Sequence, residues 1–294
     1  MALGGADGDT PFPSAITPRK TRVSVILQAH QLPRSRYIFG GFLCVMCALI
    51  PIRASAEDLQ GIFGKDDRRV IDQLGAPWAA IGHVNVTGSH SASRCTGSLI
   101  ASNLVITAAH CVMDPRRSKP FPLHQIHFVA GVRRSSSLGH STAKCLHFPP
   151  DYEYVGPSQS LPNGQDAPRR SRLRFDVVLI VLKDDINIDP LELHHGEVET
   201  SDISLVHASY PADRRYVLSG HFGCHLLAQD GTLWATDCDT HEGSSGGPVF
   251  IQGKDGLKLV AIMVGIKKGS KGYPASIAVP TLDWVDVAAK RKCP

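Results

Sequence analysis

A run of glycines and serines near the C-terminal end of the chain has the composition of a nucleophilic turn. Ser245 lies in the sequence Gly-Ser-Ser-Gly-Gly-Pro that begins at Gly243. A serine between glycines can occupy a sharp turn, so that its hydroxyl attacks a carbonyl carbon while backbone N–H groups stabilise the oxyanion. Because glycine and serine also make ordinary flexible loops, the run indicates catalysis only if the chain supplies a base and an acid.

Two other segments contain residues that can act as this base and this acid. His110 ends an apolar stretch, residues 99–109, and is followed by Cys111. Imidazole can take a proton from the serine and return it to the leaving group, because its ordinary pKa of about 6.5 lies close to neutral pH. Asp176 is a lone carboxylate that opens the apolar run 177–182. It could hold the imidazole in the required tautomer and stabilise the imidazolium.

The order His110, Asp176 and Ser245 along the chain resembles that of the trypsin/chymotrypsin-like serine peptidases, as does Cys111 beside the histidine. The resemblance covers roughly residues 62–294. It implies an all-β fold of two packed six-stranded antiparallel β-barrels with a C-terminal α-helix, and an active site in the cleft between the barrels. It also implies hydrolysis of peptide bonds through an acyl-enzyme, with no cofactor and no catalytic metal; the sequence leaves a structural calcium open.

The resemblance assigns the oxyanion hole to the backbone N–H groups of Gly243 and Ser245. Many animal relatives carry an aspartate directly before the nucleophile, where it pairs with a newly cut N-terminal ammonium. Ser244 is neutral, so an ammonium at Ile62 would find no charged partner there. We therefore predict that cleavage before Ile62 is not the activating switch. Ser244 and the segment 63–68 resemble the bacterial branch that includes the glutamyl endopeptidases.

Short apolar runs, many rich in Val and Ile, independently predict short antiparallel strands, because Gly, Pro, Asn or Asp separates them. The runs are 79–86, 97–109, 126–132, 177–182, 216–220, 247–251, 257–266 and 276–279. Residues 281–292 have the amphipathic pattern of a helix. The expected division is an N-terminal extension with a signal peptide, 1–56, and a peptidase domain, 57–294, with barrels at about 62–190 and 191–294.

The N-terminal region has the pattern of an export signal. Arg34 and Arg36 precede the apolar run 38–50, and the small residues 54–56 match a signal-peptidase site with cleavage before Glu57. The apolar run is short for a membrane span, although an uncleaved anchor is the alternative. We therefore expect a secreted or periplasmic protein with no stable membrane association after cleavage.

Export changes the meaning of the cysteines, because an oxidising compartment favours disulfides. With Cys44 and Cys47 in the expected leader, six of the eight cysteines remain, and sequence alone leaves their pairing open. The resemblance implies the pairs Cys95–Cys111, Cys224–Cys238 and Cys145–Cys293. A zinc site is disfavoured because the six contain no C-x-x-C pair.

Three residues are candidates for the substrate pocket: Asp239, Thr240 and Lys267. Asp239 lies where the trypsin branch has the acid at the base of its pocket, and a buried carboxylate there would favour Arg or Lys. The same Cys-Asp-Thr run also appears in glutamyl-type bacterial enzymes, in which the aspartate does not determine specificity. Lys267 follows the run 264–266 and could pair with Asp239 or attract an acidic side chain. The preference stays open, with a lean toward basic residues.

Charge and motifs limit the other functional classes. The net charge is +4, and no zinc spacing, aromatic-basic module or helix-turn-helix pattern favours nucleic acid. A polypeptide substrate is the expected partner, and a monomer is the expected state. Two alternatives remain: a catalytically silent binding protein of the same fold, and an esterase-type hydrolase. The intact set of His110, Asp176 and Ser245 argues against the first, and the family's usual peptide substrate argues against the second.

Overall fold

The structure is a computed structural model that describes residues 60–87, 92–154, 173–196, 198, 203–230, 232–267, 274–281 and 284–294. The expected leader, 1–56, and the cleavage site before Glu57 lie outside these ranges. The described residues all belong to one compact unit, Ser55–Pro294. In these ranges, no helix is both long enough and apolar enough to cross a membrane.

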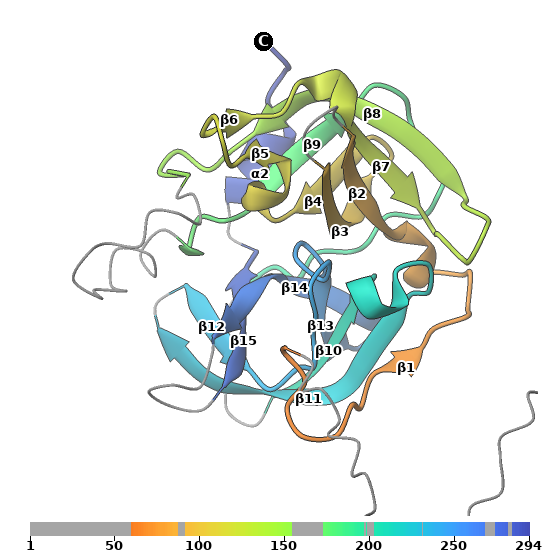
Figure 1. Ribbon diagram of the computed structural model, residues 1–294, viewed down its shortest axis with the longest axis vertical. Coiled ribbons are helices and arrows are strands. Elements are labelled where there is room, and N and C mark those ends of the chain that lie inside the picture. Colours follow the sequence, from red (N-terminus) through yellow and green to blue (C-terminus); the bar gives the residue numbers. More distant parts are fainter. Residues whose placement is uncertain are drawn as a thin grey trace, which may run out of the picture. The chain divides into compact units, whose positions relative to one another are not determined.

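The first six-stranded barrel is closed and antiparallel, and it fills the upper half of Figure 1. Its strands follow the order β2-β3-β4-β9-β8-β7 around the barrel. They are β2 (Ile81–Thr87), β3 (Ala92–Ala101), β4 (Leu104–Thr107), β7 (Ile126–Ala130), β8 (Gly139–His147) and β9 (Val178–Leu182). Strand β7 alternates buried and half-buried residues, as expected where only one face is fully covered. All of β4 is buried, which explains its continuous apolar sequence.

The second barrel fills the lower half of Figure 1 and forms from a seven-stranded antiparallel sheet, which the pairing of β11 with β12 closes. Its strands are β1 (Arg69–Val70), β10 (Ser204–Ser209), β11 (Ser219–Asp230), β12 (Leu233–Thr236), β13 (Pro248–Gly253), β14 (Gly256–Lys267) and β15 (Ala275–Pro280). Short β1 adds to the edge of β11, so six strands form the barrel itself. The predicted fold of two six-stranded antiparallel barrels is therefore confirmed.

Short elements connect and cover the barrels. They are the hairpin β5 (Met113–Asp114) with β6 (Lys119–Pro120), the 3-10 helices η1 (Trp78–Ala80), η2 (Ala109–Val112), η3 (Leu123–Gln125) and η4 (Ala212–Arg214), and helix α2 (Trp284–Ala289). The expected C-terminal helix is present, but α2 is shorter than the predicted 281–292. Thr281 instead continues the strand pairing, since its N–H and hydroxyl donate to the carbonyl of Val260. Beyond α2, a disulfide at Cys293 holds the tail on β8.

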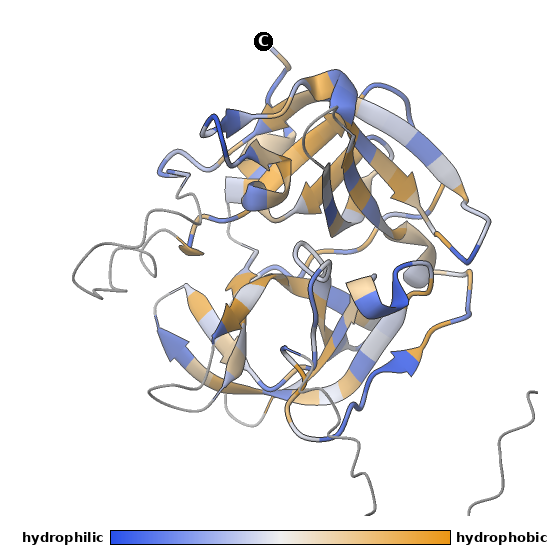
Figure 2. Cartoon of the chain, viewed as in Figure 1, coloured by the Kyte–Doolittle hydropathy of each residue, from blue (hydrophilic) through white to orange (hydrophobic). Residues whose placement is uncertain are grey.

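Buried apolar side chains fill both barrels and the contact between them. Hydrophobic residues, orange in Figure 2, recur along the strands of both barrels. The larger cluster includes Ile81, Phe128 and Leu179 from the first barrel and Phe250 from the second. Trp78 links the barrels, because its ring lies edge-on to Phe250 with centroids 6.1 Å apart. The continuous core means that residues on facing strands of the two barrels hold fixed relative positions.

Candidate active site

The candidate base and acid meet at one end of the first barrel. Strands β4 and β9 pair with Thr107 opposite Val178. His110 follows β4 within η2, and Asp176 directly precedes β9, so the strand pairing brings them together. His110 Nδ1 donates to Asp176 Oδ2 at 2.7 Å, and the His110 backbone N–H donates to Oδ1 at 2.8 Å. The carboxylate thus fixes both the orientation of the ring and its tautomer.

The surroundings of this pair set the protonation of His110. The Asp176 side chain is buried, whereas that of His110 is 36% exposed. Desolvation opposes the charged imidazolium, but the charge of Asp176 and its hydrogen bond outweigh desolvation and raise the pKa of His110 above its ordinary value. Because Nδ1 carries the proton, Nε2 is left to accept one from a nucleophile.

The disulfide Cys95–Cys111 lies where the two barrels meet. The Cys111 sulfur is 3.8 Å from His110 Nε2 and 3.9 Å from the carbonyl oxygen of Ser245. The proposed base and the proposed nucleophile, which come from different barrels, therefore contact one sulfur atom.

The first barrel also binds the backbone of residues 243–247, which contain the candidate nucleophile Ser245 and are called the nucleophile loop below. Thr96 of β3 donates its N–H to the Ser245 carbonyl at 2.8 Å and its hydroxyl to the Gly243 carbonyl at 3.0 Å. The N–H of Gly246 donates to the Met263 carbonyl of β14 at 2.7 Å. The N–H groups of Gly243 and Ser245 donate to no residue within the described ranges. These two donors are the ones that the sequence assigns to an oxyanion hole.

Two glycines are required by the shape of this loop. Gly243 and Gly246 have φ of +90° and +81°, in the left-handed region that side chains disfavour. A Cβ on Gly243 would lie 2.9 Å from the Tyr210 carbonyl oxygen. A Cβ on Gly246 would overlap the Thr107 hydroxyl and the Thr96 carbonyl. The loop can approach the first barrel this closely only because both positions lack a side chain.

The structure records no hydrogen bond between the Ser245 hydroxyl and His110 Nε2, although both residues lie in the described part of the chain. Such bonds are often long or poorly aligned before a substrate binds.

Of the three candidate pocket residues, Asp239 and Thr240 are buried and Lys267 is half-buried. The Asp239 carboxylate is buried and accepts the backbone N–H groups of Phe63 and Asp67, each at 2.9 Å. Thr240 is buried, and its hydroxyl has no partner within the described ranges. Lys267 ends β14 and is half-buried. Although Lys267 and Asp239 are both described, no ion pair joins them.

Three side chains beside the candidate pocket have the spacing of metal ligands, but their hydrogen bonds do not fit a metal site. Oxygen and nitrogen atoms of Asp67, His221 and Asp239 lie within 4.8 Å of one another. However, His221 Nδ1 accepts the Asp239 N–H at 2.8 Å, so its lone pair is already used. The Asp239 carboxylate is buried, and each of its oxygens accepts one backbone N–H. We therefore infer no metal at this group.

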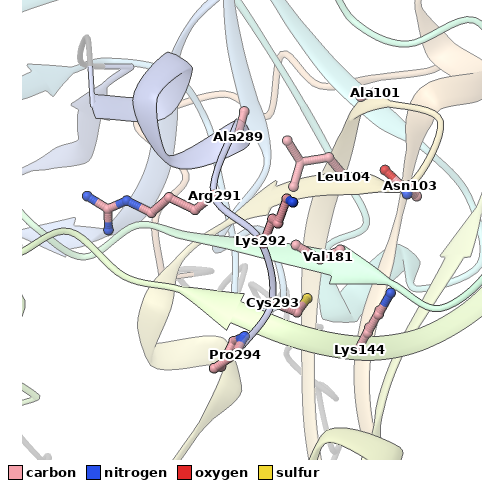
Figure 3. Close-up of a pocket in the computed structure, with 10 residues that line it drawn as sticks. All are labelled: Ala101, Asn103, Leu104, Lys144, Val181, Ala289, Arg291, Lys292, Cys293 and Pro294. Carbon is pink, nitrogen blue, oxygen red and sulfur yellow. The ribbon is translucent and has the colours of Figure 1, made fainter.

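The other two expected disulfides are also present. Cys224–Cys238 joins β11 to the segment that leads to the nucleophile, and Cys145–Cys293 joins β8 to the C-terminal tail. A pocket of about 540 Å³ is lined in part by this tail, and His110 is not among its lining residues (Figure 3). Leu104 forms part of its apolar wall, and Lys144 is among the cations at its rim.

Three residues that shape the site escaped the sequence interpretation. Thr96 binds the nucleophile loop, Ser209 donates to the Ser244 hydroxyl at 2.8 Å, and Tyr210 contributes the carbonyl that excludes a side chain at Gly243. Thr96 and Ser209 belong to unremarkable strand sequences and Tyr210 directly follows β10, so no local signal could have identified them.

Sequence and structure comparisons agree with this arrangement. Residues 95–262 match the trypsin-like peptidase domain. The chain therefore belongs to the trypsin-like peptidase family. No curated protein matches it. A solved structure, "Structure of Glu endopeptidase in complex with MPD", shares 19% identity at a TM-score of 0.58, over 76% of this chain and 96% of that one. At this identity the likeness shows a common fold.

Proposed function

We propose that the protein is an exported serine endopeptidase that uses Ser245, His110 and Asp176. The observation that carries this proposal is the 2.7 Å bond from His110 Nδ1 to Asp176, which leaves Nε2 as the free base beside the nucleophile loop. Family membership supports the same reaction class. The three disulfides agree with an oxidising compartment, in which such bonds persist.

The reaction follows from these positions. The Ser245 oxygen attacks the carbonyl carbon of the scissile bond while His110 Nε2 takes the hydroxyl proton. The resulting oxyanion accepts hydrogen bonds from the N–H groups of Gly243 and Ser245, and Asp176 stabilises the imidazolium. His110 then gives its proton to the leaving amine, which leaves an acyl ester on Ser245. Water, deprotonated by His110, attacks this ester. The Ser245 oxygen then leaves and takes the proton from His110, which releases the acid and restores both side chains.

A fluorophosphonate probe tests the nucleophile directly, because it phosphonylates an activated serine with loss of fluoride. We expect labelling of the wild type and of Ser135→Ala, a control at an exposed serine, but not of Ser245→Ala. Absence of labelling in folded wild type would favour the silent binding protein. Labelling with hydrolysis of esters but of no peptide would favour the esterase alternative.

The structure supports a revised proposal for specificity. Asp239 is 1% exposed, and its carboxylate faces the backbone N–H groups of Phe63 and Asp67, so it is not open to a basic side chain of the substrate. We therefore propose that Asp239 does not select Arg or Lys. Matched peptides with Arg, Glu or Phe before the scissile bond test this. Faster cleavage after Arg, lost in Asp239→Asn, would contradict the proposal; the fold shared with a Glu endopeptidase makes Glu the informative alternative.

We also propose that cleavage before Ile62 does not activate the protein. Ser244 has neutral partners, so a new ammonium at Ile62 has no charge to meet there. N-terminal sequencing of purified active protein tests it. Activity confined to protein that starts at Ile62, with protein that starts at Glu57 inactive, would overturn it.

A further inference from the structure

The segment from Gly61 to Ile71 lies along the second barrel and is bound to it at both ends. In Figure 1 this orange segment runs beside β11. At one end the Gly61 carbonyl accepts the N–H of Thr240 at 2.9 Å. At the other, β1 pairs with β11, and the N–H of Ile71 donates to the Leu218 carbonyl at 2.8 Å. The segment thus contacts the chain shortly before the nucleophile loop.

The middle of this segment contains a buried guanidinium. The Arg68 side chain is 2% exposed. It binds Asp213 in a bidentate arrangement, with distances of 3.1 Å and 2.7 Å, and it binds Asp66 through Nε and Nη2 at 2.9 Å and 3.0 Å. Arg214 adds a second cation, which binds Asp66 at 2.5 Å. Bidentate pairs of this kind hold both position and orientation.

The two arginines lower the pKa values of the carboxylates that they bind. The hydrogen bond from Arg68 holds the pKa of Asp66 below its ordinary value. Burial opposes ionisation of Asp213, but the hydrogen bond and charge of Arg68 outweigh it, so the pKa of Asp213 is also lowered. The cluster is therefore fully charged at neutral pH.

A backbone hydrogen bond connects this cluster to the oxyanion hole. Asp213 belongs to η4, and the preceding residue, Ala212, donates its N–H to the Glu242 carbonyl at 2.6 Å. The Glu242 carbonyl and the Gly243 N–H belong to one planar peptide unit and point in opposite directions. Holding the carbonyl on Ala212 therefore sets the direction of the Gly243 N–H.

We infer that Arg68 and Asp213 are positioning residues for the oxyanion hole. Arg68 anchors η4 to the segment 61–71, and η4 in turn orients the Glu242–Gly243 peptide. The inference rests on the proposed function, because it gives this peptide its role in catalysis. Ser244 in this loop is neutral, and we assign the ordering of the loop instead to a cluster that is charged at neutral pH.

Kinetics of three variants test the role. In Asp213→Asn and Arg68→Gln we expect kcat to fall by about 10²-fold, as for loss of one oxyanion-hole donor, with KM changed less than about threefold. Arg68→Lys keeps the charge but not the bidentate geometry, so its kcat should lie between that of the wild type and that of Arg68→Gln. The control is Arg134→Gln, because Arg134 is exposed and its ion pair with Asp72 spans 4.0 Å.

Hydrogen exchange gives a readout that does not require activity. In Asp213→Asn, which preserves the shape of the side chain, the hydrogen-bonded amides in and just before the nucleophile loop should exchange at least about tenfold faster, while those of β7 in the other barrel stay unchanged. These amides belong to His241, Ser244, Gly246 and Gly247. Unchanged exchange, or faster exchange without a fall in kcat, would overturn the inference. If the wild type neither labels nor hydrolyses peptides, the proposed function fails. Faster exchange in the variant would then still support the link from Asp213 to the loop.

Discussion

Ser209 Oγ donates a hydrogen bond of 2.8 Å to Ser244 Oγ, and both side chains are buried. The N–H of His241 donates to the same oxygen at 3.2 Å. Ser244 stands where many relatives carry an aspartate that requires a cationic partner. Two neutral donors satisfy a hydroxyl at this position without any ammonium.

Replacement of Ser244 by aspartate should be strongly destabilising at neutral pH. Ser244→Asp places a carboxylate at a buried position that holds only neutral donors, so we expect the free energy of unfolding to fall by about 3 kcal/mol or more. Burial raises the pKa of such a carboxyl in the folded state, so the loss should shrink as pH falls from 7 toward 4. Urea unfolding at several pH values measures this.

Ser244→Ala is the matched control, because it removes the same hydrogen bonds without adding a charge. Its loss should be about 1–2 kcal/mol and independent of pH. A pH-independent deficit in Ser244→Asp would show that its carboxyl reaches water or a cation.

A comparison of alanine variants at Gly246 and Gly223 distinguishes the cost of steric overlap from the cost of backbone strain. Both have positive φ, +81° and +82°, but an added Cβ meets the Thr107 hydroxyl and the Thr96 carbonyl only at Gly246. We expect Gly223→Ala to lower the free energy of unfolding by about 1–2 kcal/mol, the cost of the left-handed conformation. Gly246→Ala should cost clearly more and should abolish probe labelling, because Ser245 is displaced. Equal losses of stability, measured by urea unfolding, would contradict the close approach of the loop to the first barrel.

The pKa of His110 should depend on Asp176. An NMR titration of the His110 ring should give a value above the ordinary one of about 6.5, and Asp176→Asn should lower it. Only neutral imidazole can accept the Ser245 proton, so the acid limb of kcat/KM should follow the same raised pKa. Asp176→Asn should also reduce kcat by about 10⁴-fold. A wild-type titration midpoint below 6.5 would show that desolvation outweighs the carboxylate.

The raised pKa of His110 also contributes to stability. This contribution is fully present below the ordinary pKa and is lost as pH rises through the folded value.

Burial of His83 should make the protein less stable in acid. Desolvation lowers the pKa of His83 to about 4, and its ring stacks on Tyr210 with centroids 4.4 Å apart. Between pH 6.5 and about 4 the unfolded chain binds a proton that the folded chain does not, so the free energy of unfolding falls as pH falls. His83→Phe keeps an aromatic ring on Tyr210 and should reduce this dependence. Part of it should remain, because burial also lowers the pKa of His207 to about 4. The exposed control His195→Gln should leave the pH dependence unchanged.

Part of the fold and the candidate site was predictable because it depends on local pattern. The apolar runs 126–132 and 177–182 each predict a strand, and β7 and β9 lie within them. The helix was predicted too long: amphipathic periodicity extends to residue 292, but α2 ends at Ala289, and the tail is then held by the disulfide at Cys293. A disulfide to a distant strand leaves no trace in the helical pattern.

The sequence by itself determined which side chains are chemically able to react, several of the strands that flank them and the family. Residue type and short-range periodicity are properties of a few neighbouring positions, so they can be read without a fold. The tertiary structure decided what surrounds Ser245. Thr96 and Gly243 are 147 residues apart in the chain, and Arg68 and Asp213 are 145 apart. Their contacts exist only because barrel closure and barrel packing bring these distant segments together.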